Sequence, residues 1–469
     1  MAQTDILARH VKIIEPNNVN LNSKNINFVI DNKEDMSVID LPGVKMRIGI
    51  QIKKNAPSTD LLSAATETQC VPCQNFCHSI WSNVEVVLNQ EDIVSSQDYM
   101  YGTRAYMSKL MEITPGQQEL EFTRSGFMIE EGMHKDIGEA VRDAAATTLK
   151  VKAANFEPVQ DEDTKMIHTS AVKANLSGKL QDLFFRTNAA GGTKTDGRTH
   201  YFEDHIYEAP FTTTNTALPY GIPLKVNFTR QNNKLYYLKG TNAANYEIDI
   251  RKFQLVVPYL RISAQKFKEI ESKIQDPGKG VNIWLTRNIV SEKPIVEGRN
   301  NHMFNDLFPI GKVSVLPETF IFTVVHNDNM FGAADGYNHM YLHNNLQKFF
   351  CTLPGNLVVP PVENPDYDFT NGMSELAYGD FLDLLQVDRD GMGSPVTESI
   401  YRDCTGWFGV RLTPQTSRPE TAQSTGMGDM SLTCRWAANP GASLTLLMIG
   451  TFKHKITITK NRKVVLSWR

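Results

Sequence analysis

The densest group of potential metal-ligating residues lies within the first third of the chain. It contains Cys70, Cys73, Cys77 and His78, and thiolates with two or three residues between them can chelate zinc or an iron–sulfur cluster. Cys77 and His78 are adjacent, however, and would point to opposite sides of an extended segment, and no second Cys/His pair follows at zinc-finger spacing. Cys73, Asn75, Cys77 and Ser79 occupy alternate positions, so they would share one face of an extended segment. We therefore expect the cysteines to pack as small apolar side chains.

A second candidate resembles the middle of a calcium-binding loop. Asp388 and Asp390 precede Gly391 at the spacing of an EF-hand. In that register the first and twelfth loop positions are Gln386 and Thr397, and neither supplies the carboxylate that the loop requires. An Asp-Gly turn is the expected structure here.

Two further segments carry residues that could bind or react. Residues 189–197 are rich in glycine, but no strong strand precedes them and no helix start follows, which favours an exposed loop over an anion site. His326 and Asp328 follow an apolar run at 320–325, and such a pair can act in acid–base catalysis. Polar residues where a buried strand leaves the core have the same pattern, so we expect no catalysis there.

The common catalytic and nucleotide-binding motifs are missing from the chain. It contains no G-x-x-x-x-G-K-[ST], no H-E-x-x-H and no G-x-S-x-G. These absences remove the common routes to an enzyme without excluding one. We predict that the protein is not an enzyme and has no catalytic residue, no metal site and no cofactor, which the family resemblance described below favours.

The amino-acid composition excludes further classes of protein. Among 469 residues, 48 Lys and Arg stand against 52 Asp and Glu, which disfavours a protein that coats nucleic acid through a basic surface. A total of 6 cysteines fits a reducing compartment. Asp5 and Arg9 interrupt any secretory signal, and no segment has the ~18 uninterrupted apolar residues of a membrane-spanning helix.

Alternation of apolar and polar residues, the period of a half-buried strand, dominates the chain. It is clearest at residues 44–52, where Val44, Met46 and Ile48 begin one apolar face. The same alternation predicts further strands at residues 84–88, 222–228 and 455–459. Segments that are apolar on both faces, as expected between two packed layers, occur at residues 253–257, 320–325 and 444–449.

Helical periodicity is confined to three short segments. Each follows a serine that can cap a helix, namely Ser95 or Ser96, Ser263, and Ser374. The second segment is predicted to extend over residues 264–274. Short helices among many strands, with 22 Pro and 30 Gly, are typical of a β-sandwich with long decorated loops.

The strands fall into two sets, which predicts an all-β protein of two tandem sandwiches. The small polar segment at 239–245 is the expected linker. The expected parts are an N-terminal arm at 1–37, a first sandwich at 38–240 with an insertion near 113–200, and a second sandwich at 241–469 with an insertion near 333–443.

One stretch of the chain reads Val71-Pro-Cys-Gln-Asn-Phe-Cys-His-Ser-Ile-Trp-Ser-Asn-Val-Glu-Val-Val-Leu-Asn89. It resembles a conserved region of double jelly-roll major capsid proteins. These are the hexon-like proteins of Polinton/Maverick elements, adintoviruses and adomaviruses. Tyr101-Gly-Thr-Arg104-Ala-Tyr106 is similar to the family's Y-P-Y-R-A-Y, from which Gly102 and Thr103 depart. Further similar segments follow in the family's order, at 38–41, 218–226, 246–262, 316–332 and 406–414.

The resemblance covers residues from about 38 to 460 and bears on single positions as well. Family members have apolar residues where this chain has Cys73 and Cys77, which favours packing for both. His78 coincides with a histidine of the family, for which the family supplies no catalytic role.

The resemblance implies two jelly rolls in tandem, a double jelly roll, and a structural role in a virion. Members of the family form homotrimers, so that six jelly rolls make a pseudo-hexagonal capsomer, and capsomers tile an icosahedral shell around double-stranded DNA. The implied partners are other copies of the chain, penton (vertex) proteins and minor capsid proteins, with no specific nucleic-acid sequence and no membrane span. Synthesis in the host cytoplasm and assembly in the host nucleus are the implied locations.

Two alternatives stay open. A minor capsid or vertex protein of the same kind of virus is one, although vertex proteins usually contain a single jelly roll. A β-sandwich glycan-binding protein is the other. It would need clustered exposed aromatic residues beside carboxylates, whereas the tryptophans are dispersed at Trp81, Trp284, Trp407, Trp436 and Trp468.

Overall fold

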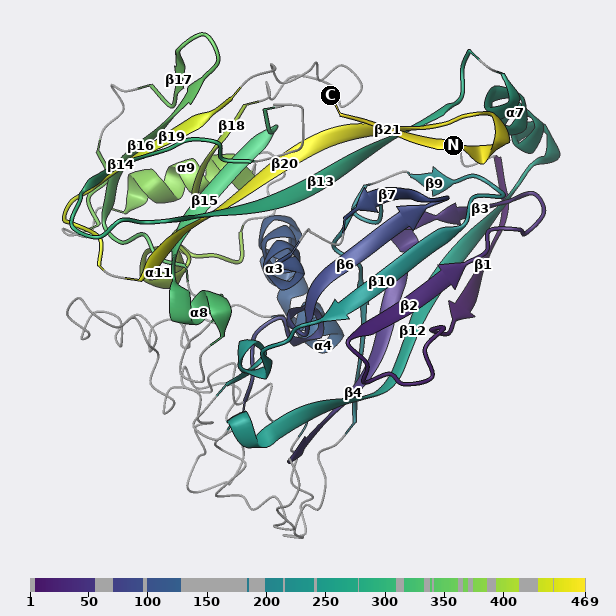
Figure 1. Cartoon of the computed structure of the whole chain (residues 1–469), viewed down its shortest axis with the longest axis horizontal. Helices are drawn as coiled ribbons and strands as arrows, with labels where there is room; N and C mark the ends of the chain where they lie inside the picture. Colours follow the sequence, from purple (N-terminus) through teal and green to yellow (C-terminus); the bar gives the residue numbers. More distant parts are fainter. Residues whose placement is uncertain are drawn as a thin grey trace.

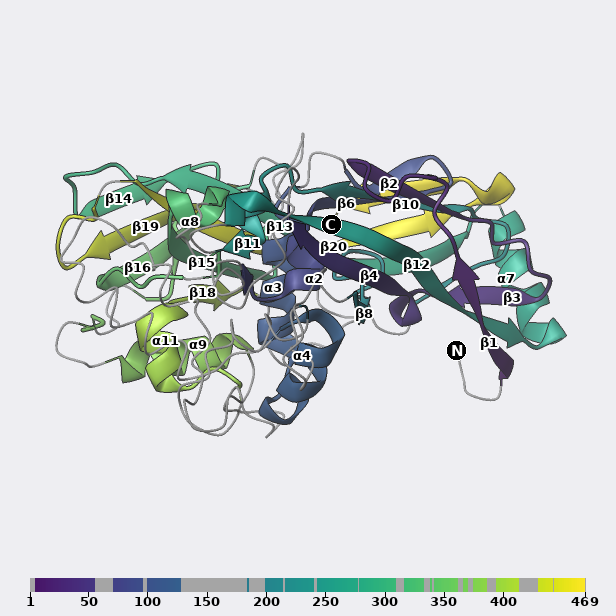
Figure 2. The same cartoon turned by 90° about the horizontal axis from the view of Figure 1, so that it is seen from below.

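The structure is a computed structural model in which two β-sandwiches stand side by side (Figures 1 and 2). The first is built mostly from the N-terminal half of the chain and the second from the C-terminal half. The structure describes residues 5–54, 71–95, 99–127, 184, 199–213, 216–239, 243–276, 278–308, 316–332, 338–339, 341–361, 366–369, 374–385, 394–412, 429–441 and 443–468.

The first sandwich consists of two antiparallel sheets. The larger sheet contains β1 (Ile6–Ile14), β3 (Ser37–Asp40), β4 (Lys45–Lys54), β8 (His200–His205), β9 (Ala217–Leu218) and β12 (Tyr246–Ile262). The smaller sheet contains β2 (Asn25–Ile30), β6 (Trp81–Leu88), β7 (Glu91–Val94) and β10 (Leu224–Arg230). A short pair, β5 (Val71–Pro72) with β11 (Leu238–Lys239), lies beside them.

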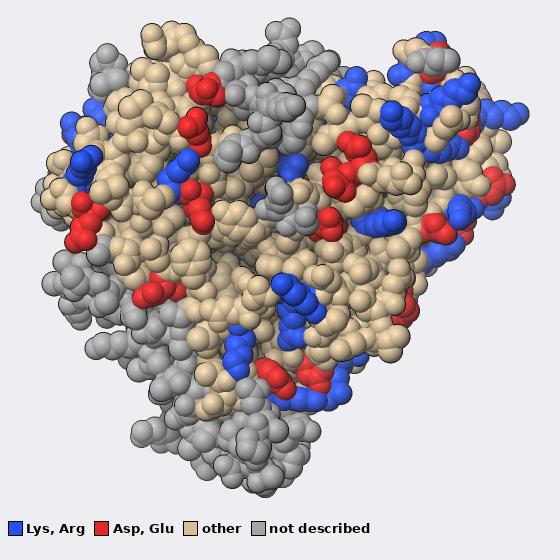
Figure 3. Space-filling model, viewed as in Figure 1, with Lys and Arg blue, Asp and Glu red and all other residues tan. Residues whose placement is uncertain are grey.

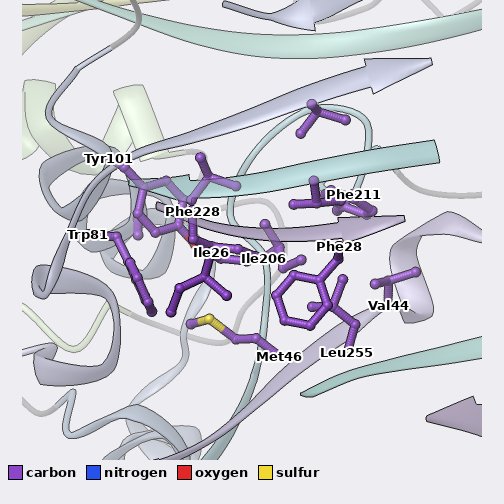
Figure 4. Packing of buried hydrophobic residues seen from close by; sticks show 14 of the residues in the cluster. Ile26, Phe28, Val44, Met46, Trp81, Tyr101, Ile206, Phe211, Phe228 and Leu255 are labelled. Carbon is purple, nitrogen blue, oxygen red and sulfur yellow. The ribbon is translucent and has the colours of Figure 1, made fainter. Parts of the chain in front are cut away.

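The core of the first sandwich follows from the predicted alternation. On β4 the side chains of Met46, Ile48 and their alternate neighbours are fully buried, which confirms the strand expected at 44–52. Aromatic rings from the smaller sheet meet them, as Figure 4 shows for Phe28, Trp81 and Phe228. Burial of these side chains is the main stabilising term of the sandwich.

The second sandwich also has two antiparallel sheets. The larger contains β13 (Val281–Pro294), β15 (Thr319–His326), β18 (Phe408–Arg411), β20 (Leu444–Ile458) and β21 (Val464–Trp468). The smaller contains β14 (Asn301–Phe304), β16 (Leu346–Leu353), β17 (Leu357–Val359) and β19 (Ser431–Trp436).

Both sandwiches have the same strand order. In the first, β3 and β4 count as one strand, and the eight successive strands are β1, β2, β3/β4, β6, β7, β8, β10 and β12. In the second, the eight strands run from β13 to β20. In each, one sheet has the order first–eighth–third–sixth and the other second–seventh–fourth–fifth. This is the wiring of a jelly roll, so the protein contains two of them in tandem, and the predicted all-β fold class is confirmed.

Strand pairing corrects the expected division of the chain. The segment expected to be an N-terminal arm contains β1 and β2, which pair with β12 and β10 inside the first jelly roll. β12 was expected to open the second jelly roll, yet it is the last strand of the first, because it provides hydrogen-bonding partners for β4 on one side and β1 on the other. The connection between jelly rolls is therefore residues 263–280, not 239–245.

The expected insertion at 333–443 is also corrected, because it contains four strands of the second sandwich, β16 to β19. These strands are short, so their alternation is brief in the sequence, and helices lie between β17 and β18. The helices that interrupt this region are α9 (Glu375–Leu385) and α11 (Glu398–Cys404), with α8 (Asn327–Phe331) before it.

Two of the three predicted helices are confirmed at their starting serines. Helix α7 (Ala264–Gln275) begins after Ser263, whose side chain accepts a hydrogen bond from the Lys266 N–H at 3.2 Å. Helix α9 begins after Ser374. The third, α3 (Tyr101–Glu112), begins after Met100 rather than at Ser95 or Ser96. No helix within the described ranges is long and apolar enough to cross a membrane.

Candidate functional site

Helix α3 lies between the two sandwiches and contacts both cores (Figure 1). Tyr101 and Ala105, one helical turn apart, pack in the first core. Tyr106 and Leu110, again one turn apart on another face, pack in the second core together with Met107. A helix from the connection between β7 and β8 therefore joins the two jelly rolls.

Buried polar side chains of the second jelly roll contact this helix and the residues beside it. The His339 ring stacks on Tyr106, with ring centroids 4.2 Å apart, and its Nε2 lies 3.3 Å from the Ser79 Oγ of helix α2 (Phe76–Ser79). Burial lowers the pKa of His339 to about 3, so the imidazole is neutral near pH 7. The Asn338 side-chain amide donates to the Tyr236 carbonyl. We call these contacts, with helix α3, the joint.

A group of charged side chains is buried at the first-sandwich side of the joint. The Lys109 Nζ of α3 donates to Asp204 on β8, to Ser125 on helix α4 (Gln118–Ser125), and to Glu121 Oε2 at 2.9 Å. The Lys109 and Asp204 side chains are completely inaccessible, and the Glu121 side chain is 7% exposed. Together with His78 these four residues form what we call the ionic cluster.

His78 completes the cluster from α2. Its Nε2 lies 2.9 Å from Asp204 Oδ2 and its Nδ1 lies 3.0 Å from the Tyr101 hydroxyl. That hydroxyl already accepts the Tyr207 N–H at 3.3 Å, so it donates to His78 Nδ1, which leaves the Nε2–H to donate to Asp204. Burial lowers the pKa of His78, consistent with this neutral tautomer.

Electrostatics keep Asp204 ionised. Burial alone would raise its pKa, but the Lys109 ammonium and the His78 hydrogen bond together hold the pKa of Asp204 below its usual range. A desolvated ion pair of this kind gains stability only when its remaining hydrogen-bonding positions are filled, and the second oxygen, Oδ1, accepts the His205 N–H at 2.8 Å.

A second buried pair lies one turn earlier on α3. The Arg104 Nε and NH2 donate to Glu208 Oε2 at 3.0 and 2.5 Å, and both side chains are 2% exposed. A third guanidinium nitrogen donates to the Tyr99 carbonyl at 2.5 Å. The carboxylates of both buried pairs thus come from one segment, β8 and the residues after it.

Of these residues, the sequence indicated His78 as a candidate ligand, and it indicated Tyr101 and Arg104 only as part of a segment similar to the capsid family. Lys109 and Asp204 are 95 positions apart, and Arg104 and Glu208 are 104 apart, so no local spacing connects the partners. Burial of residues 101–110 in α3 requires buried anions for its cations, but that burial is seen only in the structure.

The cysteine segment has a different structure from the predicted extended one. Cys77 and His78 lie in helix α2, and Cys73 precedes it. Both thiols are buried in the first core, and burial raises the pKa of Cys73 to about 11. The part of the chain that the structure describes contains no group of three or more His, Cys, Asp or Glu able to hold a metal ion. Cys70 lies outside the described residues.

The other motifs have local roles or fall outside the described ranges. His326 ends β15, and its Nδ1 accepts the Asp328 N–H at 3.2 Å, capping the short helix α8. The pocket lined by Lys348, Phe349, Pro360, Pro361, Tyr367, Leu376 and Asp380 is in the second sandwich, away from the ionic cluster. The segments 189–197 and 386–391 lie outside the described residues.

The Lys109 and Asp204 side chains are inaccessible to solvent, so the ionic cluster is closed to a dissolved substrate. Its geometry suits it to bonding structural elements together.

Comparison with solved structures identifies the class of fold. No protein-family profile and no curated protein sequence matches the chain. A chain in the cryo-EM structure of the Sputnik virophage is similar at 12% identity with a TM-score of 0.56, over 99% of this chain and 89% of that one. A chain of the PBCV-1 virus capsid is similar at 8% identity with a TM-score of 0.50, over 98% and 97% of the two chains.

The mavirus major capsid protein also matches, at 10% identity with a TM-score of 0.48, over 98% of this chain and 90% of that one. The Sputnik and PBCV-1 similarities span both jelly rolls rather than one. The chain therefore has the double jelly-roll fold of virus capsid chains, and the resemblance found in the sequence is confirmed at the level of the fold.

Proposed function

We propose that this chain is a viral major capsid protein, a structural component of the virion without catalytic activity. Three copies would associate into a pseudo-hexagonal capsomer, and capsomers would tile an icosahedral shell around double-stranded DNA. The observation that carries the proposal is the match of both jelly rolls, over nearly the whole chain, to a chain of the Sputnik virophage structure.

The proposed assembly needs two jelly rolls fixed to one another, since three such pairs give the six similar corners of the capsomer. Two elements support that rigidity. Helix α3 belongs to both cores, and the long strand β20 contributes Leu446 and Met448 to the second core and Ile456 and Ile458 to the first. A subunit with these shared elements presents a fixed angle between its jelly rolls to the neighbouring copies.

The surface is compatible with packing against many copies. On the face seen in Figure 3, positive and negative side chains are interspersed over a largely uncharged surface. The formal net charge of −4 on 469 residues adds little self-repulsion between subunits. Association around a three-fold axis would use head-to-tail contacts that close into a ring.

Further partners follow from the same proposal. The shell would also contact penton (vertex) and minor capsid proteins, and the chain would be made in the host cytoplasm and assembled in the host nucleus. These statements are supported by the resemblance to the hexon-like family. The alternative of a single-jelly-roll vertex protein is disfavoured by the second complete jelly roll.

Burial of most of the described tryptophans disfavours the glycan-binding alternative, which needs exposed aromatic rings. Trp81, Trp407 and Trp436 are completely buried, so none of the three can stack on a sugar ring. Trp284 is 40% exposed on β13.

The test is the mass of the purified full chain in solution, measured by light scattering behind a size-exclusion column. A stable species at three times the 52.8 kDa of the chain is expected, and electron microscopy of concentrated samples should then show pseudo-hexagonal particles. A protein that remains monomeric at every concentration tested would contradict the proposal, because the function of a shell protein is its assembly.

A further inference from the structure

The ionic cluster contains a nucleophile, an electrophile and a base in contact with one another. The Lys109 nitrogen lies against the Asp204 carboxyl group, and Glu121 Oε2 is 2.9 Å from the same nitrogen. Because the Lys109 and Asp204 side chains are packed in direct contact in the interior, the two functional groups are held at a high effective concentration. We propose that Lys109 and Asp204 condense to form an intramolecular isopeptide bond, with Glu121 as the proton-transferring catalytic residue.

The reaction balances without a co-reactant. The Lys109 ammonium passes one proton to the Asp204 carboxylate, and the free amine attacks Cγ to form the C–N bond. Glu121 takes a second proton from the nitrogen and delivers it to the departing hydroxyl, and the C–O bond breaks. One water leaves, Glu121 returns to its carboxylate form, and no atom is oxidised or reduced.

The surroundings assist the stages that follow the first proton transfer. The His78 Nε2–H donates to Asp204 Oδ2 and the His205 N–H to Oδ1, so both oxygens are hydrogen-bonded when negative charge collects on them. Glu121 is held in place by Arg124, 3.1 Å away. The aromatic rings of Phe127 and Tyr207 lie 5.6 and 5.2 Å from the Lys109 nitrogen and exclude solvent.

Burial also supplies a reason for the product to form. A buried ammonium and carboxylate each carry a large desolvation cost, which an uncharged amide in the same place does not. The bond would tie α3 to β8 and close a loop across the 95 positions that separate the two residues. A shell subunit linked in this way keeps the joint closed when the surrounding packing loosens.

The neighbouring pair provides an internal control within the same fold. Arg104 and Glu208 are as deeply buried as Lys109 and Asp204 and bridge the same two segments. A guanidinium does not condense with a carboxylate under these conditions, since it stays protonated. The proposal therefore predicts a covalent link at one of the two buried pairs and none at the other.

The experiment is intact-mass measurement of the denatured full chain, followed by peptide mapping. The expected mass is lower than the sequence mass by one water, with a branched peptide that joins Lys109 to Asp204 and lacks cleavage after Lys109. Glu121→Gln should restore the full mass. The matched variant Glu208→Gln should keep the loss of water. Melting curves of each variant would show that the measured protein had folded.

A wild-type chain that melts cooperatively and has the full sequence mass would overturn the proposal, as would a dehydrated peptide that maps to other residues. Loss of water that persists in Glu121→Gln would remove Glu121 from the mechanism. These results are independent of the trimer measurement, so failure of the isopeptide bond and failure of the capsid proposal are separable.

Discussion

The two jelly rolls share one strand order but are stabilised at different places by different interactions. At the joint, helices α2, α3 and α4 of the first jelly roll are bonded to β8 and the residues after it through buried charges, including Lys109 with Asp204 and Arg104 with Glu208. In the second, the corresponding helices α9 and α11 cover an aromatic core, in which the ring centroids of Phe322, Phe349 and Phe408 lie 5.0 to 6.2 Å apart.

The difference concerns specificity as well as free energy. A buried ion pair is barely favourable in itself, but leaving one partner alone is costly, so the pair permits a single arrangement of its elements. Aromatic packing stabilises mainly through the apolar area that it buries, and removal of one ring leaves no uncompensated charge. The region that must fix the angle between the jelly rolls thus uses charges, and the region that fills a core uses rings.

The largest expected effect comes from breaking a buried pair. Arg104→Met leaves the Glu208 carboxylate buried without its cation, which should lower the free energy of unfolding by about 3–5 kcal/mol. Chemical denaturation of the variant and the wild type measures the difference.

The control is the double variant Arg104→Met with Glu208→Gln, which leaves no uncompensated charge. It should be more stable than Arg104→Met alone. If the two substitutions instead added their costs, the pair would not act as a unit, and the contrast between charged and aromatic regions would fail.

Acid should weaken the protein through two buried histidines. Burial lowers the pKa of His339 and of His454 to about 3, whereas an unfolded histidine titrates near about 6.5. Above that value neither state is protonated and the contribution to stability is complete. As pH falls toward about 3, the unfolded chain binds the protons first, and each histidine removes about 1.4 kcal/mol per pH unit.

Denaturation midpoints measured between neutral pH and pH 4 test this slope. His339→Gln should reduce the slope by the share of one histidine, because glutamine does not titrate. An unchanged slope would mean that His339 is protonated in the folded joint, against its packing on Tyr106.

Aromatic packing predicts a smaller and graded effect. Phe322→Leu removes the ring that contacts Phe320, Phe349 and Phe408 and should cost about 1.5 kcal/mol. The matched variant Phe28→Leu loses contacts with Phe228 and Phe253 in the first core and should cost less. Equal losses, or a larger loss at Phe28, would show that the second core does not depend more on its rings.

Much of this fold could be predicted because its signals are local. The alternation at 44–52 and the serine before α7 each act over a few residues, and both predictions are confirmed. Segments 444–449 and 455–459 are one strand, because the residues between them continue to pair with β13.

The boundaries and the ionic cluster could not be predicted, because they depend on distant partners. Nothing near β12 in the sequence indicates that β1, more than 200 positions earlier, provides its outer edge. Asp204 and Glu208 resemble ordinary surface carboxylates until α3 brings Lys109 and Arg104 against them.

The smallest effect tests the connection between the jelly rolls. Ser263 accepts the Lys266 N–H at the start of α7, and Ser263→Ala should cost about 1 kcal/mol through loss of that cap. Ser272→Ala, on the exposed side of the same helix, is the control and should change stability by less than about 0.5 kcal/mol. Ile274 of α7 packs in the first core, but Ser263 acts on the first turn of the helix, so the contribution of its cap should follow these local rules. A loss at Ser263 as large as that of Arg104→Met would instead show that the connection fixes the angle between the jelly rolls, a role we assign to the joint.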